Sequence, residues 1–475
     1  GIEIVPKQLE VGARVLNPPQ LQYSQGSSVN PDIASSKWRG GARFKLPATV
    51  GAWGIYAVVS SRDRFNQQDL TRFAEAYVRM AKTKGMNINP PLEIDVLVSN
   101  NEKHIEEQVR SLMRRIKRAG CTFAFFITAD TISIHKNVKL EERYIELLTQ
   151  DCKLRTATNF LQKNQNQTME NIVMKTNIKH GGLNYSLSIG HLTGGYDAFP
   201  KERLYLGVAV SHAPPGVSMY DAHGVKCPAP STMGWSCNTN PDPAEFVGDF
   251  RCIESRRQEV LPEMRVVIEQ IMKLYGRIPK DLIIYRNGVS EGAFGLVLRY
   301  EIPLIRGVLN ELGAQATRLT YIAVQRDHNM RLFKKDITGT EPIPAQNVPP
   351  GTVVDSQLTH PLYKEFFLNS HSAGIGTAIT PRYTVLYDEA NYIMNEIELV
   401  THALTFSFQI VSSAISTPAP LYIADRYSTR GRDLMHSRVV DEMASTDSSR
   451  TPDIVKLNEK LAYGHCDFAT RRLNA

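Results

Sequence analysis

The 475-residue sequence lacks several features that define specialised protein classes. It contains no apolar run of about eighteen residues, which is the length a membrane-spanning helix needs. Its six cysteines are too sparse in so long a chain for a disulfide scaffold, and none forms a C-x-x-C pair, so reduced, intracellular thiols are expected. It has no internal repeat and no low-complexity tract. These absences predict a globular protein without a membrane span.

A zinc site is the one metal-binding pattern that the cysteines suggest. Cys227, Cys237 and Cys252 lie near His212 and His223 in the sequence. Their spacing does not fit ordinary zinc fingers. We therefore do not assign zinc to this region.

The composition is that of a soluble globular chain, with 42% hydrophobic and 22% charged residues. The length allows two or three domains. A net charge of +7 and a pI near 8.9 are compatible with an anionic partner such as nucleic acid. The opening "GIEIVPKQLE" has neither an initiating Met nor a basic and apolar leader. We expect a fragment without a secretory signal and a cytoplasmic location.

The first part of the chain alternates between strand and helix patterns. Because such alternation implies right-handed crossovers, it predicts a mainly parallel, Rossmann-like sheet with its ligand beyond the carboxyl ends of the strands. The expected strands are 54–60, 92–99, 122–128 and a strand near 154–161. The expected helices are 69–85, 103–120, about 139–149 and 168–182.

A second unit follows the glycine-rich segment 190–203. Several of its strands precede its first helix, so we expect a mixed sheet. The expected strands are 204–211, 245–252, 281–286, 319–325 and 382–388. The expected helices are 254–276, about 290–313, 394–412, 418–432 and 453–463, with 342–351 as a surface loop.

Polar residues follow or interrupt apolar segments of the second unit. Ser211 and His212 follow the first strand, Asn287 follows the strand "LIIYR", and Asp425 lies within "PAPLYIADRYSTRGR". Glu259 is expected on the first turn of the helix 254–276. A two-metal nuclease needs a cluster of carboxylates, and only Glu259 and Asp425 qualify. Each of these residues also has an ordinary structural explanation as a helix-dipole partner, a surface charge or a turn residue.

Two basic pairs in the first unit have helical spacing. Lys175 and Lys179 share one helix face, and His135 and Lys139 share another. At a Rossmann-like crevice these pairs could converge on one phosphate. They could equally be exposed residues that only keep the protein soluble.

Long segments of the sequence resemble eukaryotic Argonaute proteins. The matching segments are "LIIYRNGVSEGAFGLVL", "VQRDHNMRLF", "GTVVDSQLTHPLYKEFFLNSHSAGIGTAITPRYTVLYDE" and "PAPLYIADRYSTRGR" for the PIWI domain, and "MKTNIKHGG" for the MID domain. The resemblance implies a linker at 1–48, a Rossmann-like MID domain at 49–190 and an RNase H-like PIWI domain with a mixed sheet at 191–475. It is strongest to fungal quelling-type members, and the family's N-terminal and PAZ domains have no counterpart in this sequence.

The resemblance also implies roles for individual residues in RNA silencing. MID would hold the 5′-phosphorylated end of a small guide RNA, with His135 stacking on the first base and segment 128–133 sensing it. The cations that match the family's 5′-phosphate site are Lys139, Lys175, Lys179 and Arg430. Together they suit a terminal phosphate, which carries close to two negative charges.

The catalytic positions depart from the pattern of the family's slicing members. Glu259 and Asp425 match two of four metal-binding residues, but Ala209 and Asn287 stand where aspartates are expected. Because an amide and a methyl group supply no anionic ligand, Mg²⁺ or Mn²⁺ would be held weakly by Asp425 and Glu259. We therefore expect guide binding without target cleavage.

Other interpretations remain open at this point. An active Mg²⁺-dependent endoribonuclease could complete its site with another acid, such as Asp221 or Asp249. A basic two-domain protein without RNA function is a third possibility. The resemblance further implies a complementary target RNA and tryptophan-rich silencing proteins, bound near helices 290–315 and 394–412. We expect a monomer.

Overall fold

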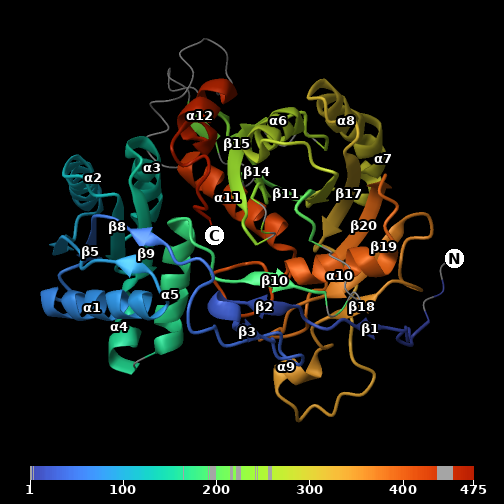
Figure 1. Ribbon diagram of the computed structural model, residues 1–475, viewed down its shortest axis with the longest axis horizontal. Helices are drawn as coiled ribbons and strands as arrows, with labels where there is room; N and C mark the ends of the chain where they lie inside the picture. Colours follow the sequence, from blue (N-terminus) through green and yellow to red (C-terminus); the bar gives the residue numbers. More distant parts are fainter. Residues whose placement is uncertain are drawn as a thin grey trace.

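The computed structural model describes most of the chain (Figure 1). The described residues are 3, 5–163, 165–190, 192, 199–213, 218–220, 226–240, 242, 244–254, 259–435 and 453–474. Within them no helix is both long and apolar enough to cross a membrane.

The first unit is a parallel sheet covered by helices on both faces, as predicted. Its strand order is β7-β5-β8-β9, and all three pairings are parallel. Helices α2 and α3 cover one face, and α1, α4 and α5 cover the other (Figure 1). The strands are β5 (Trp53–Val59), β7 (Glu93–Val98), β8 (Phe123–Thr128) and β9 (Leu148–Lys153). The helices are α1 (Gln67–Thr83), α2 (Glu102–Arg118), α3 (His135–Ile145), α4 (Leu154–Lys163) and α5 (Asn166–Lys179).

The predicted strand near 154–161 is wrong, because this segment is helix α4. Its buried residues Leu154, Ala157 and Phe160 recur every three positions, which is a helical period. The preceding helix α3 ends at Ile145, and Glu146 adopts a left-handed conformation with φ of 54°. The strand therefore begins earlier, within the segment assigned to a helix from the sequence.

The second unit is built on a mixed sheet, which confirms the predicted class. Its strand order is β1-β18-β19-β20-β17-β16-β11-β14-β15, with β11, β16 and β17 parallel and the other neighbours antiparallel. The strands are β1 (Arg14–Val15), β11 (Arg203–Ser211), β14 (Ser231–Cys237), β15 (Val247–Ile253), β16 (Asp281–Arg286), β17 (Arg318–Gln325), β18 (Thr352–Val354), β19 (Lys364–Asn369) and β20 (Arg382–Asp388). The smaller strands β12 (Ser218–Tyr220) and β13 (Lys226–Pro228) pair with each other.

Helix α11 (Ala419–Met435) lies across β11, β14 and β15. Gly207 and Gly234 permit this close approach, because a Cβ at either position would collide with the backbone of α11. The remaining helices are α6 (Met264–Tyr275), α7 (Phe294–Leu296), η3 (Val297–Glu301), α8 (Ile302–Glu311), α9 (Ile343–Gln346), α10 (Met394–Leu404) and α12 (Ile454–Leu461), with short η2 (Glu291–Ala293) and η5 (Tyr463–His465).

The helix predicted at 254–276 is shorter, since α6 begins only at Met264. Pro262 disfavours helical geometry at the residue before it, so the helix cannot extend through Leu261. Glu259 consequently lies in a bend ahead of the helix, and its side chain is exposed. The expectation that Glu259 occupies a first helical turn is wrong.

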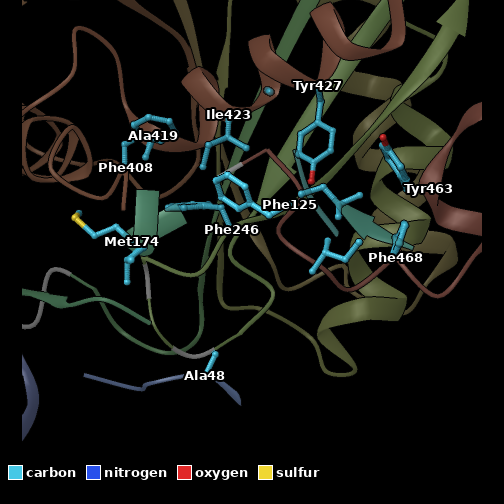
Figure 2. Close-up of a cluster of buried hydrophobic side chains, with 14 of the residues drawn as sticks. Ala48, Phe125, Met174, Phe246, Phe408, Ala419, Ile423, Tyr427, Tyr463 and Phe468 are labelled. Atoms are coloured by element: carbon cyan, nitrogen blue, oxygen red, sulfur yellow. The ribbon is translucent and has the colours of Figure 1, made fainter. Parts of the chain in front are cut away.

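The two units share one apolar core. Phe125 of β8 and Met174 of α5 belong to the same buried cluster as Phe408, Tyr427 and Tyr463 of the second unit (Figure 2). The N-terminal segment joins the units, because β1 pairs with β18 while β2 pairs with β10 and β3. The additional short elements are β2 (Gln20–Gln22), η1 (Ser24–Gly26), β3 (Ser28–Val29), β4 (Thr49–Val50), β6 (Asn87–Ile88) and β10 (Ser186–Ser188).

Candidate functional site

The seam between the two units gathers the cations that the sequence predicts to bind phosphate. Lys139 comes from α3, Lys175 and Lys179 come from α5, and Arg430 comes from α11. Helix α3 is docked on the second unit, since Arg143 Nε donates to the Ala462 carbonyl at 2.9 Å. We call these four cations, together with Glu142 and Asp151, the seam cluster.

Burial and mutual repulsion act on the lysines of the seam cluster. Lys179 is only 1% exposed. Burial lowers the pKa of Lys179 well below its usual range, and Lys139, Lys175 and Arg430 lower it further, while Glu142 opposes them. The pKa of Lys175 is also lowered, first by burial, with Asp151 opposing and Lys139 and Arg430 adding to the effect. Because the protonated lysines are destabilised in this site, a bound anion would stabilise them.

Two carboxylates in the seam cluster were not predicted. Glu142 is fully buried and accepts from Lys139 Nζ at 2.8 Å. Asp151 lies near the end of β9 and contacts His135 Nδ1 at 2.9 Å through its Oδ2. Glu142 follows Lys139 by three residues on a helix, and this spacing could have predicted their ion pair from the sequence.

His135 begins α3, and its side chain is 46% exposed. Its contact with Asp151 holds the imidazole at the edge of the seam cluster. Burial opposes ionisation of Asp151, but His135, Lys139 and Lys175 outweigh it and hold the pKa of that carboxyl far below its usual range. Segment 128–133 lies at the carboxyl end of β8, and its Thr131 and Ile132 line a separate pocket of about 550 Å³.

A second site lies beyond the ends of β11, β16 and β17. This pocket has a volume of about 680 Å³. We call it the sheet-edge pocket; its lining includes His212, Asn287, Gln325, Arg326, Asp327, Tyr422 and Asp425. Asp425 is exposed to the pocket, and its pKa is raised by partial burial, with Arg326 as the largest opposing influence.

The two departures from the slicing pattern lie beside each other in the parallel strands. Ala209 is fully buried in β11 and belongs to the apolar core. Asn287 follows β16, where its backbone N–H donates to the Val208 carbonyl at 3.1 Å. Its side-chain Oδ1 accepts from the Val210 N–H at 3.2 Å. The amide of Asn287 therefore extends the strand pairing and supplies no charge.

Glu259 is absent from the residues that line the sheet-edge pocket. Its carbonyl accepts from Arg286 Nη2 at 2.8 Å. Arg286 is itself buried and forms an ion pair with Glu301 at the end of η3. The backbone at Glu259 is thus anchored while its carboxylate faces solvent.

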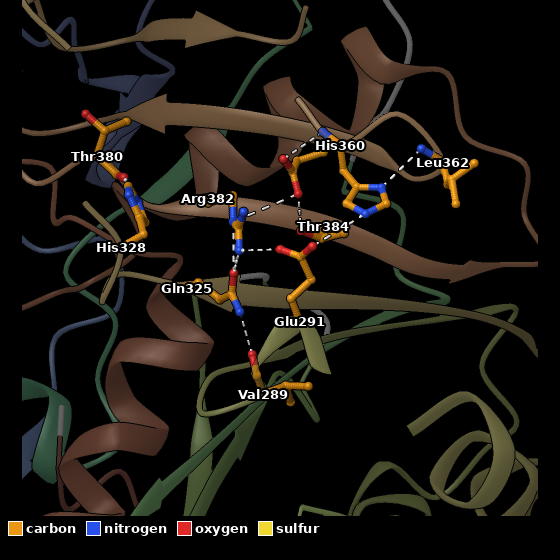
Figure 3. Close-up of polar contacts among 10 residues, drawn as sticks. Val289, Glu291, Gln325, His328, His360, Leu362, Thr380, Arg382 and Thr384 are labelled. Carbon is orange, nitrogen blue, oxygen red and sulfur yellow. Dashed lines mark hydrogen bonds and ion pairs between the residues drawn. The ribbon is translucent and has the colours of Figure 1, made fainter. Parts of the chain in front are cut away.

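A polar network supports the loop that follows β16 (Figure 3). Arg382 Nε donates to Gln325 Oε1 at 2.8 Å, and Gln325 Nε2 donates to the Val289 carbonyl at 2.7 Å. Glu291 lies 3.5 Å from Arg382 Nη2 and 3.6 Å from His360 Nε2. These contacts fix the loop that carries Asn287.

The donor set of the sheet-edge pocket does not fit a two-metal centre. In the described part of the chain, no group of three or more His, Cys, Asp or Glu side chains is placed to hold a metal ion. Asp249 does not line the pocket, because its carboxylate accepts from the N–H groups of Tyr463 at 2.8 Å and Gly464 at 2.7 Å. Asp221 and His223 lie outside the described residues.

Comparisons with known proteins agree with this architecture. The Piwi domain family matches residues 122–436, which begin inside the first unit. Argonaute protein wago-1 of Caenorhabditis elegans is 33% identical across 100% of this chain and 49% of that protein. Argonaute protein wago-4 of the same organism is 32% identical across 100% of this chain and 50% of that protein. The chain spans about half the length of these curated relatives.

Solved structures share the fold. The C-terminal lobe of a budding yeast Argonaute superposes with a TM-score of 0.75 at 21% identity, over 94% of each chain. Kluyveromyces polysporus Argonaute, solved with a guide RNA, gives a TM-score of 0.80 at 20% identity, over 99% of this chain and 57% of that one. The mixed sheet is the RNase H-like fold of PIWI domains. The chain therefore belongs to the Argonaute/Piwi family.

Proposed function

We propose that this chain binds the 5′-phosphorylated end of a small guide RNA at the seam cluster and presents the guide to a complementary target RNA. The observation that carries this proposal is the convergence of three lysines from the first unit and Arg430 from α11. Four cations against Glu142 and Asp151 leave an excess of about two positive charges, which matches a terminal phosphate. The related yeast Argonaute was solved with a guide RNA.

A fluorescence titration tests guide-end binding. Labelled RNA with a 5′ phosphate is expected to bind more tightly than the same RNA with a 5′ hydroxyl. Replacing Lys175 and Lys179 together with alanine should remove this preference, whereas Lys82→Ala, at an exposed position late in α1, should preserve it. Equal affinity of the unmodified protein for both RNAs would refute the proposal.

We further propose that the chain does not cleave the target. Ala209 and Asn287 supply no anionic ligand, and Asp425 in the sheet-edge pocket has Asp327 as its only acidic companion in that lining. Two carboxylates are too few to hold a pair of divalent metal ions tightly. The alternative of an active slicer completed by Asp249 is disfavoured, since that carboxylate is committed to Tyr463 and Gly464.

Finer features of the prediction remain proposals. We retain the division into a linker at 1–48, MID at 49–190 and PIWI at 191–475. The suggested likeness to fungal quelling-type members is not confirmed, because wago-1 and wago-4, which match the whole chain, are nematode proteins. Tryptophan-rich partners would find exposed apolar groups at Leu296 and Tyr300. A monomeric state and a cytoplasmic location stay predictions.

A further inference from the structure

The linker segment 10–22 runs along the edge of the second unit's sheet, and we call it the linker strap. Its residues Arg14 and Val15 form β1, which pairs with β18 as the outermost strand of the nine-stranded sheet. The Leu16 N–H adds one bond, to the Gly351 carbonyl at 2.8 Å. Because so short a ladder makes few backbone hydrogen bonds, side-chain contacts decide how firmly the strap is held there.

One side chain of the strap, Arg14, supplies those contacts. Arg14 Nη2 donates to Asp355 Oδ2 at 2.9 Å. The same nitrogen donates to Glu398 Oε2, and Nη1 donates to Asn395 Oδ1. Asp355 follows β18, whereas Asn395 and Glu398 lie three residues apart on α10. The guanidinium therefore joins the strap to two elements of the second unit, and we call these four residues the Arg14 clamp.

The charges of the Arg14 clamp do not balance. One guanidinium faces two carboxylates, so one negative charge is in excess when both are ionised. The Glu398 side chain is fully buried, whereas that of Asp355 is 31% exposed. Glu398 Oε1 also lacks a hydrogen-bond partner within the part of the chain that the structure describes. A buried carboxylate with an unpaired oxygen is costly to ionise, so Glu398 is the member of the clamp that favours a proton.

The pKa of Glu398 is consistent with this geometry. Burial raises it, Arg14 opposes the rise and Asp355 adds to it, with a result of about 7. His402 lies one turn farther along α10, but burial lowers its pKa to about 4, so it is neutral near pH 7. Glu398 is therefore divided between its neutral and charged forms near pH 7.

Other charged side chains near α10 have partners of their own. On β19, which packs against α10, Lys364 pairs with Asp388 at 3.1 Å. Glu365 of the same strand accepts from the Thr384 hydroxyl at 2.6 Å. The ionisation of Glu398 is thus governed by its own burial and by the charges of the Arg14 clamp.

We propose that the Arg14 clamp is a proton-controlled latch, which fastens the linker strap while Glu398 is protonated and loosens as that carboxyl ionises. Arg14 attracts the ionised carboxylate, but the pKa of Glu398 still lies above the ordinary value of 4.5, so burial and Asp355 outweigh the attraction. Release of the strap would remove Arg14 and hydrate Glu398, which makes its charge less costly. The ionised form therefore favours release. This inference concerns the connection between the units and does not depend on RNA binding.

The two states of Glu398 set the pH range of the effect. With the strap attached its pKa is about 7, and with the strap released we expect a value near the ordinary 4.5. The attached state thus binds more protons between these limits, so attachment is strongest below about pH 4.5 and is lost progressively as pH rises to about 7. Above about pH 7 both states are ionised and the attachment no longer changes.

Amide hydrogen exchange in the strap tests the inference. The measured quantity is the protection factor of residues 14–16, which is corrected for the intrinsic pH dependence of exchange. It should fall by up to about tenfold per pH unit between about pH 5 and 7, and level off above that range. Amides of the buried strand β16 serve as the reference. A parallel fall in β16 would assign the titration to the whole fold and overturn the inference.

Substitution of Glu398 distinguishes a latch from an ordinary salt bridge. Glu398→Gln keeps an acceptor for Arg14 without a charge, so the protection factor should be independent of pH and about tenfold or more higher at about pH 8 than in the unmodified protein. A simple salt bridge predicts the reverse, since removal of the charge would weaken the strap. Lower protection in Glu398→Gln at that pH would show that the inference is wrong.

Two further variants check the other members of the strap. Asp355→Asn removes the like charge beside Glu398, so its pKa should fall and the protection factor should level off at lower pH. Glu10→Gln is a matched control, because Glu10 also joins the strap to the second unit, pairing with Lys335 at 3.0 Å, but both side chains are exposed. This control should keep the pH profile of the unmodified protein. A flat profile in Glu10→Gln would assign the titration to Glu10 and exclude the latch.

Discussion

One helix, α11, contributes to two sites of opposite character. Arg430 reaches the seam cluster, where cations from both units outnumber the carboxylates. Asp425 on the same helix faces the sheet-edge pocket, where the expected carboxylates are missing. A phosphate site needs only converging positive charge, whereas a two-metal nuclease needs several anionic ligands at fixed positions. The first requirement supports the proposed guide-end site, and the second supports the proposal that the target is not cleaved.

The sites also differ in how their buried ion pairs are used. In the seam cluster, Lys139 pairs with Glu142, and both side chains also bond to Thr149. Near the sheet-edge pocket, Arg286 and Glu301 anchor the backbone at Glu259 from within the core. Both pairs are fixed in place by further hydrogen bonds, which is the condition under which buried charges are tolerated.

The largest expected effect concerns the framework of the sheet-edge pocket. Arg286→Met leaves Glu301 buried without its cation, so we expect a loss of about 3 to 5 kcal/mol in the free energy of unfolding. Chemical denaturation measures this loss. Arg265→Met, which removes a partner of the exposed pair with Glu311, should leave stability unchanged. Equal losses for both variants would contradict the role of Arg286.

A metal titration sharpens the comparison between the sites. The unmodified protein should gain no thermal stability from Mg²⁺ and should not cut a guide-paired target. In the variant Ala209→Asp/Asn287→Asp, Mg²⁺ at about 100 times its dissociation constant should add roughly 2.7 kcal/mol of stability. Calorimetry with and without Mg²⁺ measures the gain.

Two outcomes of the metal titration bear on the origin of the defect. Cleavage at mid-duplex by the restored variant would mark a site disabled only at positions 209 and 287. Efficient cleavage by the unmodified protein would show that the predicted lack of slicing is wrong. Because position 209 is fully buried, the new aspartate should lower the free energy of unfolding when no metal binds it.

Replacement of Arg430, which reaches across the seam, should have the next largest effect. Arg430→Met should weaken binding of 5′-phosphate RNA by about 1.5 to 3 kcal/mol, the range for a charge-assisted hydrogen bond. Binding of 5′-hydroxyl RNA should change little. Lys136→Met is a matched control, because Lys136 also crosses the seam, pairing with Asp433 at 3.3 Å, but stands outside the cluster. A comparable loss of affinity for 5′-phosphate RNA in Lys136→Met would show that Arg430 has no specific role in binding the phosphate.

The last effect is a dependence on pH. The lowered pKa values of Lys175 and Lys179 mean that the empty site loses protons below the usual lysine range near 10.4. A bound phosphate raises those pKa values, so binding takes up protons. The preference for 5′-phosphate RNA should therefore fall as pH rises from about 7 towards 10, by at most about tenfold per unit for one proton.

The titration of Lys179 also makes the stability of the folded protein depend on pH, in the opposite direction to RNA binding. Because the folded-state pKa of Lys179 lies below its unfolded value, the unfolded chain binds more protons between the two values. Its contribution to stability therefore increases as pH rises through that window. Lys179→Met should flatten both the binding and the stability profiles. An unchanged binding profile in this variant would assign the proton uptake to another group.

The sequence predicted most elements of the fold but misplaced two of them. The alternation of apolar periods identified the parallel and mixed sheets. It failed at 154–161, where buried residues at helical spacing were taken for a strand, and at 254–263, where Pro262 and the bend at Glu259 precede α6. It also missed β14, which is buried along its length beneath α11.

What the sequence determined by itself is the chemistry available at each position. It specified that residues 209 and 287 carry no charge and that lysines occur at helical spacing, because side-chain type is a local property. Only the tertiary structure decided which donors remain free. Lys139 and Lys175 are the same residue type, yet three acceptors occupy Lys139 while Lys175 keeps its ammonium group unbonded in the described structure. That difference arises because α3 and β9 bring Glu142 and Thr149 onto Lys139, and hydrogen bonding depends on which atoms the fold brings within reach.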